Sequence, residues 1–90
     1  MRWTIDFDHR AFKDLERLDK QDRDRISQYL AERVAKATSP RALGKPLMGS
    51  RFGELWRYRV GDYRLICQIK DEQLLVLVVE VGHRSQVYRT

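Results

Sequence analysis

The sequence predicts a single α+β domain in which a four-stranded, mainly antiparallel sheet carries a helical hairpin on one face. The chain has 90 residues, which is enough for one hydrophobic core. Its first half shows an alternating segment followed by two segments of helical periodicity, and its second half shows three β-rich segments in succession. The expected order of elements over residues 1–90 is therefore β-α-α-β-β-β.

The first half of the chain predicts a short strand and two helices. Residues 2–7 alternate between apolar and polar side chains, as a half-buried edge strand does. Asp8 can cap a first helix that runs to about residue 18, and a second helix follows from Asp19 or Lys20 to Ala37. Apolar side chains recur at helical spacing in both helices, at Ala11, Phe12, Leu15 and Leu18 and then at Ile26, Tyr29, Leu30, Val34 and Ala37. We expect the two helices to pack as an antiparallel hairpin.

The second half predicts a long loop and three antiparallel strands. Residues 38–53 contain both prolines and three of the five glycines, so we expect an ordered loop and no further element. Its apolar side chains should pin it to the core, and these are Leu43, Leu47, Met48 and Phe52. The segments LWRYRV, YRLICQIK and QLLVLVVEV follow, separated by the dipeptides Gly-Asp and Asp-Glu. Short connections of this kind join neighbouring antiparallel strands.

Composition excludes several classes of protein. No segment reaches the roughly 20 apolar residues that span a bilayer, and the start MRWTIDFDHR lacks the apolar stretch of a signal peptide, so we expect a cytoplasmic protein without a membrane partner. A single cysteine, Cys67, excludes internal disulfides and is expected to be a buried apolar residue.

The charge distribution favours a polyanionic partner. The formal net charge is +5, with nine basic against eight acidic residues in 1–40 and nine against five in 41–90. Such a charge does not by itself separate nucleic acid from an acidic protein or lipid. The excess of basic over acidic residues nevertheless lies mainly in the second half of the chain.

The Gly-Asp turn brings basic side chains together. A two-residue turn after residue 60 places Arg59 directly opposite Arg64, with Arg57 two residues away on the same face. Because like charges opposed across a sheet are destabilising, this cluster predicts a bound anion. Guanidinium groups keep their charge and match the oxygens of a phosphate, so the cluster is suited to stabilising charge on a phosphoryl group.

The opposite face of these strands predicts the core. Its side chains are nearly all apolar, namely Trp56, Tyr58, Val60, Tyr63, Leu65, Cys67 and Ile69. If the Asp-Glu dipeptide also forms a two-residue turn, the arginine face receives Leu75, Leu77, Val79, Val81 and His83. Part of that apolar surface would lie under residues 38–53, and part would form an exposed patch for a protein partner.

The C-terminal segment adds groups that move protons. The ending VGHRSQVYRT places His83, Arg84 and Tyr88 just past the last strand, where they can curl over the rim of the basic face. Alone, such a histidine is more often a solvated loop residue and such a tyrosine a plug of the sheet edge. Together with the arginines they supply what metal-free RNA cleavage requires, which is cations for the phosphorane and proton transfer at the 2′-hydroxyl and the 5′-oxygen.

Metal chemistry has little support in the sequence. The two histidines, His9 and His83, fall in different elements, and no pair of carboxylates occurs at ligand spacing within the basic face. We expect no metal and no cofactor.

Three segments, GKPLMG, LWRYRVGDYRLICQI and VLVVEVGHRSQVYR, closely resemble the RelE branch of the RelE/ParE toxin superfamily, and the likeness extends over essentially the whole chain. The resemblance implies a ribonuclease that enters the ribosomal A site and cleaves mRNA there, using the 2′-hydroxyl of the RNA to leave a 2′,3′-cyclic phosphate. It also implies a cognate RelB-like antitoxin that wraps the toxin. The complex would repress their shared promoter, so the toxin would meet promoter DNA only through that complex.

The resemblance also assigns roles to residues of this chain. Arg57 and Arg59 match two basic residues that bind RNA. The catalytic group comprises the phosphate-stabilising Arg64 and the C-terminal pair Arg84 and Tyr88. His83 stands where other members often carry lysine, and we expect it to act as a proton donor or acceptor. The best-known members have lysines in place of Arg57 and Arg59. Since arginine does not give up its proton, neither of these two positions is expected to supply the general base, whose identity stays open.

Two other functions remain open. A ParE-like toxin on the same fold would inhibit DNA gyrase by binding and would cleave nothing, although retention of Arg64, Arg84 and Tyr88 argues against it. A noncatalytic nucleic-acid-binding module is favoured by the charge alone. Salt-sensitive binding without cleavage would support that third reading.

Overall fold

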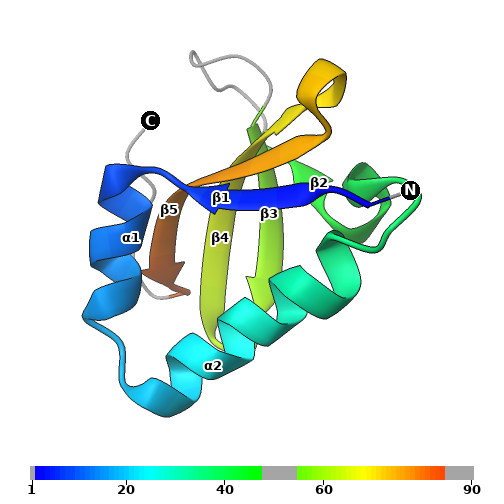
Figure 1. The fold of residues 1–90 in the computed structure, drawn as a ribbon. Coiled ribbons are helices and arrows are strands. Elements are labelled where there is room, and N and C mark those ends of the chain that lie inside the picture. Colours follow the sequence, from blue (N-terminus) through cyan, green and yellow to red (C-terminus); the bar gives the residue numbers. More distant parts are fainter. Residues whose placement is uncertain (1, 48–54, 85–90) are drawn as a thin grey trace.

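The computed structural model describes residues 2–47 and 55–84 and shows an α+β fold in which helices cover one face of a sheet (Figure 1). The expected fold class and the order of the main elements are confirmed. The helices are α1 (His9–Glu16) and α2 (Lys20–Tyr29), and α2 continues as a π-helical turn over Leu30–Val34. The strands are β1 (Thr4–Phe7), β2 (Lys45–Pro46), β3 (Leu55–Val60), β4 (Tyr63–Lys70) and β5 (Leu75–His83).

The sheet has five strands in the order β1-β5-β4-β3-β2, with β1 parallel to β5 and the other neighbours antiparallel. The expectation that residues 38–53 contain no further element was wrong, because this segment holds a 3₁₀ helix at Pro40–Leu43 and the strand β2. Proline is tolerated in β2 because an edge strand does not need every backbone donor. Leu43 and Leu47 are half-buried, whereas Met48 and Phe52 lie outside the described residues.

Both helices begin at the aspartates that the sequence predicts. The backbone amide of Ala11 donates to Asp8 Oδ1 at 2.9 Å, and that of Asp22 donates to Asp19 Oδ1 at 3.0 Å. Each bond satisfies an amide that a helix N-terminus otherwise leaves without an acceptor.

We expect Asp8→Ala to lower the free energy of unfolding by about 1 kcal/mol, because the Ala11 amide loses its acceptor. Urea denaturation followed by circular dichroism measures the change. Asp24→Ala is the control, since it removes an exposed ion pair with Lys20 in place of a cap. An equal loss of stability in the two variants would contradict the capping role.

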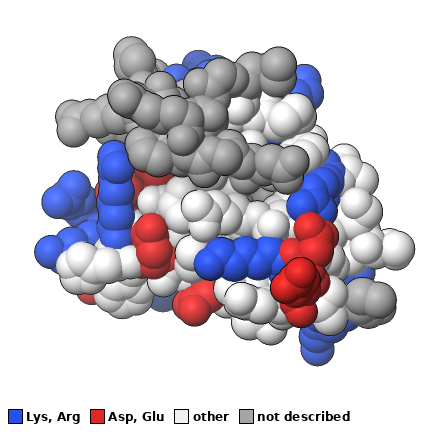
Figure 2. All heavy atoms as spheres, turned by 90° about the horizontal axis from the view of Figure 1, so that it is seen from above, with Lys and Arg blue, Asp and Glu red and all other residues white. Residues whose placement is uncertain are grey.

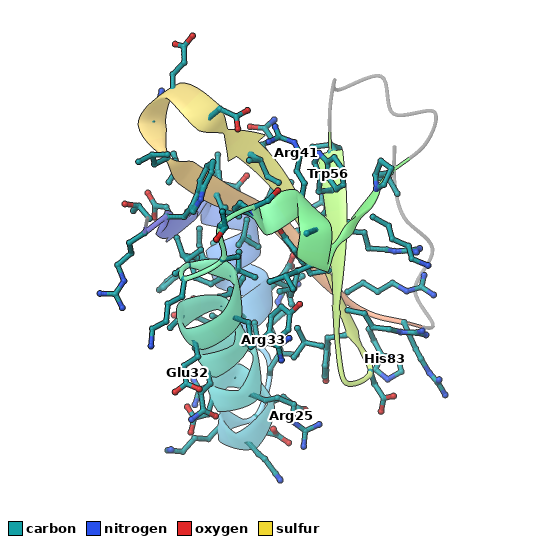
Figure 3. All side chains as sticks on the ribbon, turned by 90° about the vertical axis from the view of Figure 1, so that its right-hand side faces the viewer. Arg25, Glu32, Arg33, Arg41, Trp56 and His83 are labelled. Atoms are coloured by element: carbon teal, nitrogen blue, oxygen red, sulfur yellow. The ribbon has the colours of Figure 1, made fainter. Side chains whose placement is uncertain are left out.

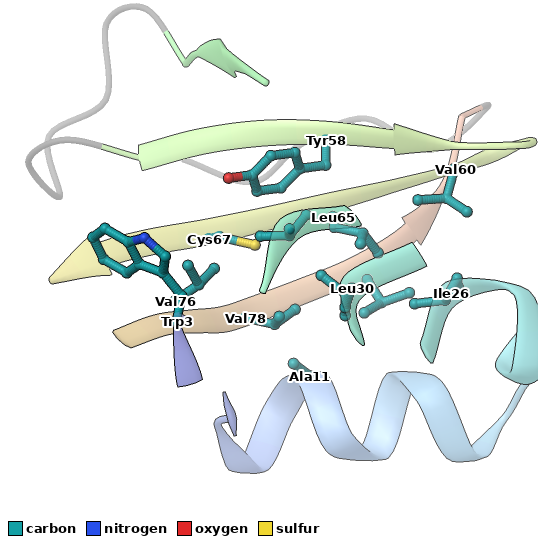
Figure 4. Packing of buried hydrophobic residues seen from close by; sticks show 12 residues of the cluster. Trp3, Ala11, Ile26, Leu30, Tyr58, Val60, Leu65, Cys67, Val76 and Val78 are labelled. Atoms are coloured by element: carbon teal, nitrogen blue, oxygen red, sulfur yellow. The ribbon is translucent and has the colours of Figure 1, made fainter. Parts of the chain in front are cut away.

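The core lies between the helices and the facing side of the sheet (Figure 4). The apolar face predicted for β3 and β4 is confirmed, since Tyr58, Val60, Leu65 and Cys67 are buried there. From the helices, the buried residues that meet this face are Ala11, Ile26, Leu30 and Val34. Burial raises the pKa of the Cys67 thiol, so this residue is a packed apolar side chain, as expected.

The second hairpin differs from its expected register. Residues 71–74 connect β4 to β5 in place of the expected two-residue turn, and Leu75 pairs with Lys70. Leu74, the last residue of this connection, has a φ of 48°. A β-bulge then leaves Val79 without a partner, because Ile66 pairs with Glu80 and the next residue of β4 pairs with Val78.

The bulge shifts the alternation of β5 by one residue. Leu77 pairs with Gln68 on the arginine face, as predicted, but Val81 pairs with the buried Leu65 on the helix side, and His83 follows it there. The placement of Val81 and His83 on the arginine face was therefore wrong. On the described part of the arginine face, Leu75 and Leu77 of β5 are half-buried. Among the described residues, the large apolar side chain that is exposed is Phe12, on α1, at 52%.

Candidate functional site

The three arginines predicted to converge lie together on the sheet face away from the helices. Arg59 pairs directly with Arg64 across β3 and β4, which confirms the predicted register, and Arg57 is two residues from Arg59. All three line one pocket of about 170 Å³. In Figure 3 the helices lie on one side of the sheet and several side chains ending in nitrogen project from the other.

A fourth cation, Lys45, lines the same pocket. It pairs with Arg57 across β2 and β3, so the two side chains share a face. The pocket thus joins two cross-strand pairs of like charge on three neighbouring strands. Sequence reasoning missed Lys45, because a two-residue strand that contains a proline has no periodicity by which to recognise it.

The pocket concentrates positive charge. Its described lining comprises Leu43, Gly44, Lys45 and the three arginines, and none of these is acidic. Glu80 shares this face of the sheet, but its Oε1 lies 3.4 Å from Nη2 of Arg10. By contrast, the face shown in Figure 2 carries both acidic and basic side chains, with uncharged residues between them. An anion in the pocket would relieve the repulsion among its cations.

Contacts from β3 and from the turn after β4 hold the segment that carries Lys45. The guanidinium of Arg41 donates two hydrogen bonds to the carboxylate of Asp71, both at 2.8 Å, and lies 5.7 Å from the ring centroid of Trp56 (Figure 3). The hydrogen bond and charge of Arg41 hold the pKa of the Asp71 carboxyl below its usual range. The buried Tyr58 hydroxyl donates to the carbonyl of Pro40 at 2.7 Å, and burial raises the pKa of this hydroxyl.

Gly44 allows the backbone of this segment to approach β3 closely. A Cβ at position 44 would lie 2.8 Å from the carbonyl oxygen of Arg57 and 3.0 Å from the ring of Tyr58. A side chain would therefore push β2 away from β3.

Arg84 lies beside the turn between β3 and β4. Its backbone amide donates to the carbonyl of Asp62 at 2.7 Å, and its Nε is 3.7 Å from Asp62 Oδ1. The turn follows Arg59 and precedes Arg64, so Arg84 stands at the rim of the basic face, as predicted.

His83 is placed differently from the arginines. Its ring packs edge-on against Tyr63, with centroids 5.5 Å apart, and lines a second pocket of about 280 Å³ together with Asp14, Arg17 and Leu18. The structure therefore does not bring His83 into the arginine pocket. Tyr88, the remaining predicted site residue, lies outside the described residues.

Within residues 2–47 and 55–84, no group of three His, Cys, Asp or Glu side chains is arranged to hold a metal ion. Over the same residues, no helix has the length and apolar character needed to cross a membrane.

Comparison with known proteins decides the family. Residues 5–88 match the family model described as "ParE toxin of type II toxin-antitoxin system, parDE". The chain is also 34% identical to the mRNA interferase toxin RelE of Escherichia coli, over 98% of this chain and 92% of the relative. The chain belongs to the RelE/ParE superfamily of toxins.

Solved structures of RelE toxins share this fold. The toxin–antitoxin complex RelBE2 of Mycobacterium tuberculosis matches with a TM-score of 0.83 at 27% identity, covering 96% of this chain and 95% of that one. The intact RelBE complex of Escherichia coli matches with a TM-score of 0.73 at 29% identity, covering 93% of this chain and 99% of that one. The resemblance noted in the sequence is confirmed, and the chain is a type II toxin of the RelE family.

Proposed function

We propose that this toxin is a metal-independent endoribonuclease that cleaves mRNA in the ribosomal A site and so inhibits translation. The observation that carries the proposal is the pocket in which Arg57, Arg59 and Arg64 converge without a carboxylate among its described lining. The identity with RelE mRNA interferases supports the same activity.

Cleavage by this route needs charge stabilisation more than any other assistance. The 2′-oxygen attacks phosphorus while the bond from phosphorus to the 5′-oxygen breaks, which yields a 2′,3′-cyclic phosphate and a 5′-hydroxyl. The 2′-hydroxyl loses a proton and the leaving 5′-oxygen gains one. Negative charge on the phosphoryl oxygens increases in the transition state, so fixed guanidinium groups stabilise it more than they stabilise the substrate. In this scheme Arg57 and Arg59 bind the RNA backbone and Arg64 stabilises the phosphorane.

Arg84 would orient the phosphate at the rim of the pocket, and Tyr88 would transfer a proton. The position of His83 against Tyr63, on the helix side of the sheet, favours Arg84 and Tyr88 over His83 for these tasks.

We expect His83→Ala to leave single-turnover cleavage of mRNA on programmed ribosomes within roughly threefold of wild type, well short of the 10²–10⁴-fold that a general acid or base contributes. Rates measured across the pH range between about 5.5 and 8 check this, since a catalytic histidine titrates there. Loss of one limb of the pH profile in His83→Ala would return the proton-transfer role to His83.

We also propose a cognate RelB-like antitoxin as the partner of this cytoplasmic toxin, because the matching structures from two bacteria are complexes with an antitoxin. Contact with promoter DNA would be made by the complex.

A ParE-like toxin that inhibits DNA gyrase without cleavage is the second candidate, because the matching family model is that of ParE toxins. One paired assay separates the two: purified toxin is added in EDTA to ribosomes programmed with mRNA, and separately to a gyrase supercoiling reaction. Cut message with active gyrase supports the first function. Intact message with inhibited gyrase selects the second, and salt-sensitive RNA binding with neither activity selects a noncatalytic binding module.

A further inference from the structure

Lys45 is a cation of the arginine pocket to which nothing so far assigns a role. Its backbone pairs with Arg57, and its side chain lines the pocket with Arg57, Arg59 and Arg64. Residues directly opposite in an antiparallel pair point to the same face with their Cβ atoms roughly 5 Å apart. Lys45 therefore extends the basic surface by one strand, from β3 to β2.

The fold holds this lysine in place by contacts outside its short strand. A two-residue strand supplies few ladder hydrogen bonds, so the position of Lys45 depends on what precedes it. The Arg41 bridge to Asp71 and the Tyr58 bond to the Pro40 carbonyl tie that segment to the sheet, and Gly44 permits the close approach. Like charges opposed across neighbouring strands are destabilising, so an anion bound beside Lys45 would stabilise this arrangement.

The number of cations exceeds what one phosphodiester requires. The linkage that is cut carries one negative charge, and a second develops on its oxygens in the transition state. Lys45 and the three arginines supply four positive charges. The pocket therefore has charge for the scissile phosphate and for a neighbouring one.

We infer that Lys45 binds a backbone phosphate adjacent to the scissile phosphate and thereby positions the message for cleavage. The inference rests on the proposed ribonuclease function and extends its site from β3 and β4 to β2. Lys45 acts in binding, and its ammonium takes no part in the chemical step. A lysine presents a compact point charge on a flexible stem, which suits a phosphate contact that need not be held in one geometry.

The test is single-turnover cleavage on programmed ribosomes over a range of toxin concentrations, which gives a half-saturating concentration and a maximal rate. Lys45→Ala is expected to raise the half-saturating concentration roughly tenfold, because one charged hydrogen bond is lost. The maximal rate should stay within about threefold of the wild-type rate. Lys45→Arg, which keeps the charge and gives up no proton, should restore the wild-type value. Lys70→Ala is the matched control, because Lys70 has the same charge and the same face of the sheet but does not line the pocket.

A modified message identifies the phosphate. An uncharged methylphosphonate is placed on either side of the scissile linkage in turn. If Lys45 contacts one of these phosphates, neutralising it raises the half-saturating concentration for wild type and has no further effect on Lys45→Ala, as in a double-mutant cycle.

Four results would overturn the inference. If Lys45→Ala behaves like Lys70→Ala, or keeps its full defect with both modified messages, then Lys45 does not contact such a phosphate. The proposed ribonuclease function is unaffected by either result. A Lys45→Ala defect confined to the maximal rate assigns the lysine to chemistry instead. Absence of cleavage by the wild-type toxin overturns the proposed function itself, and is recognised because every variant is then equally inactive.

Discussion

Replacing Arg64 with alanine is expected to slow cleavage of message on programmed ribosomes by about 10²–10³-fold, which is the usual cost of removing one preorganised donor to a developing oxyanion. Arg64 lies directly opposite Arg59 at the turn end of β3 and β4, so its loss removes charge from the pocket without removing a core residue. The cleaved fraction with time, read by primer extension in EDTA, gives the rate.

Two variants make that result specific. Arg33→Ala removes the same charge from the helix side of the molecule (Figure 3) and should leave the rate unchanged. Arg64→Lys keeps the charge but loses the planar fork, so it should recover part of the rate. Unchanged cleavage by folded Arg64→Ala, or an equal loss in Arg33→Ala, would contradict a role for the pocket in the chemical step.

The largest expected effect on stability is that of Tyr58→Ala, at about 3–5 kcal/mol lost from the free energy of unfolding. Tyr58 is fully buried, faces the helices, and contacts the ring of Tyr29, whose centroid is 6.3 Å away. A truncation to alanine leaves a cavity in the layer between sheet and helices, and also frees the Pro40 carbonyl from its donor. Urea denaturation followed by tryptophan fluorescence measures the loss.

Tyr58→Phe separates packing from hydrogen bonding. It keeps the ring and removes only the hydroxyl, so it should cost roughly 1–2 kcal/mol, since a buried carbonyl is left without its partner. Equal destabilisation by the two substitutions would contradict the account of the core, because the ring itself would then contribute nothing.

The parts of the fold that were predictable depend on short-range patterns. The bounds of β3 and β4 follow from the Gly-Asp turn, which fixes the pairing of Arg59 with Arg64. The starts of both helices follow from Asp8 and Asp19, whose carboxylates accept from amides three residues later. These features need no knowledge of the rest of the chain, and the sequence alone therefore locates the three arginines of the pocket.

The parts that were not predictable depend on distant contacts. The bulge at Val79 lets Val81 bury itself opposite Leu65, and this packing preference outweighs simple alternation and turns His83 toward α1. Likewise β2 forms because the preceding segment is tied to Trp56, Tyr58 and Asp71, which lie elsewhere in the chain. Lys45 enters the pocket for the same reason.

The claim on which the account depends is that the arginine face of β3 and β4 receives the RNA backbone. A nuclear magnetic resonance titration of the arginine Nε–H groups tests it, using a short RNA whose attacking 2′-hydroxyl is replaced by hydrogen so that it is not cut. The account predicts that the resonances of Arg57, Arg59 and Arg64 shift together as RNA is added, while that of Arg33 on the helix side does not. Shifts confined to the helix side, or none at the three arginines, would contradict it.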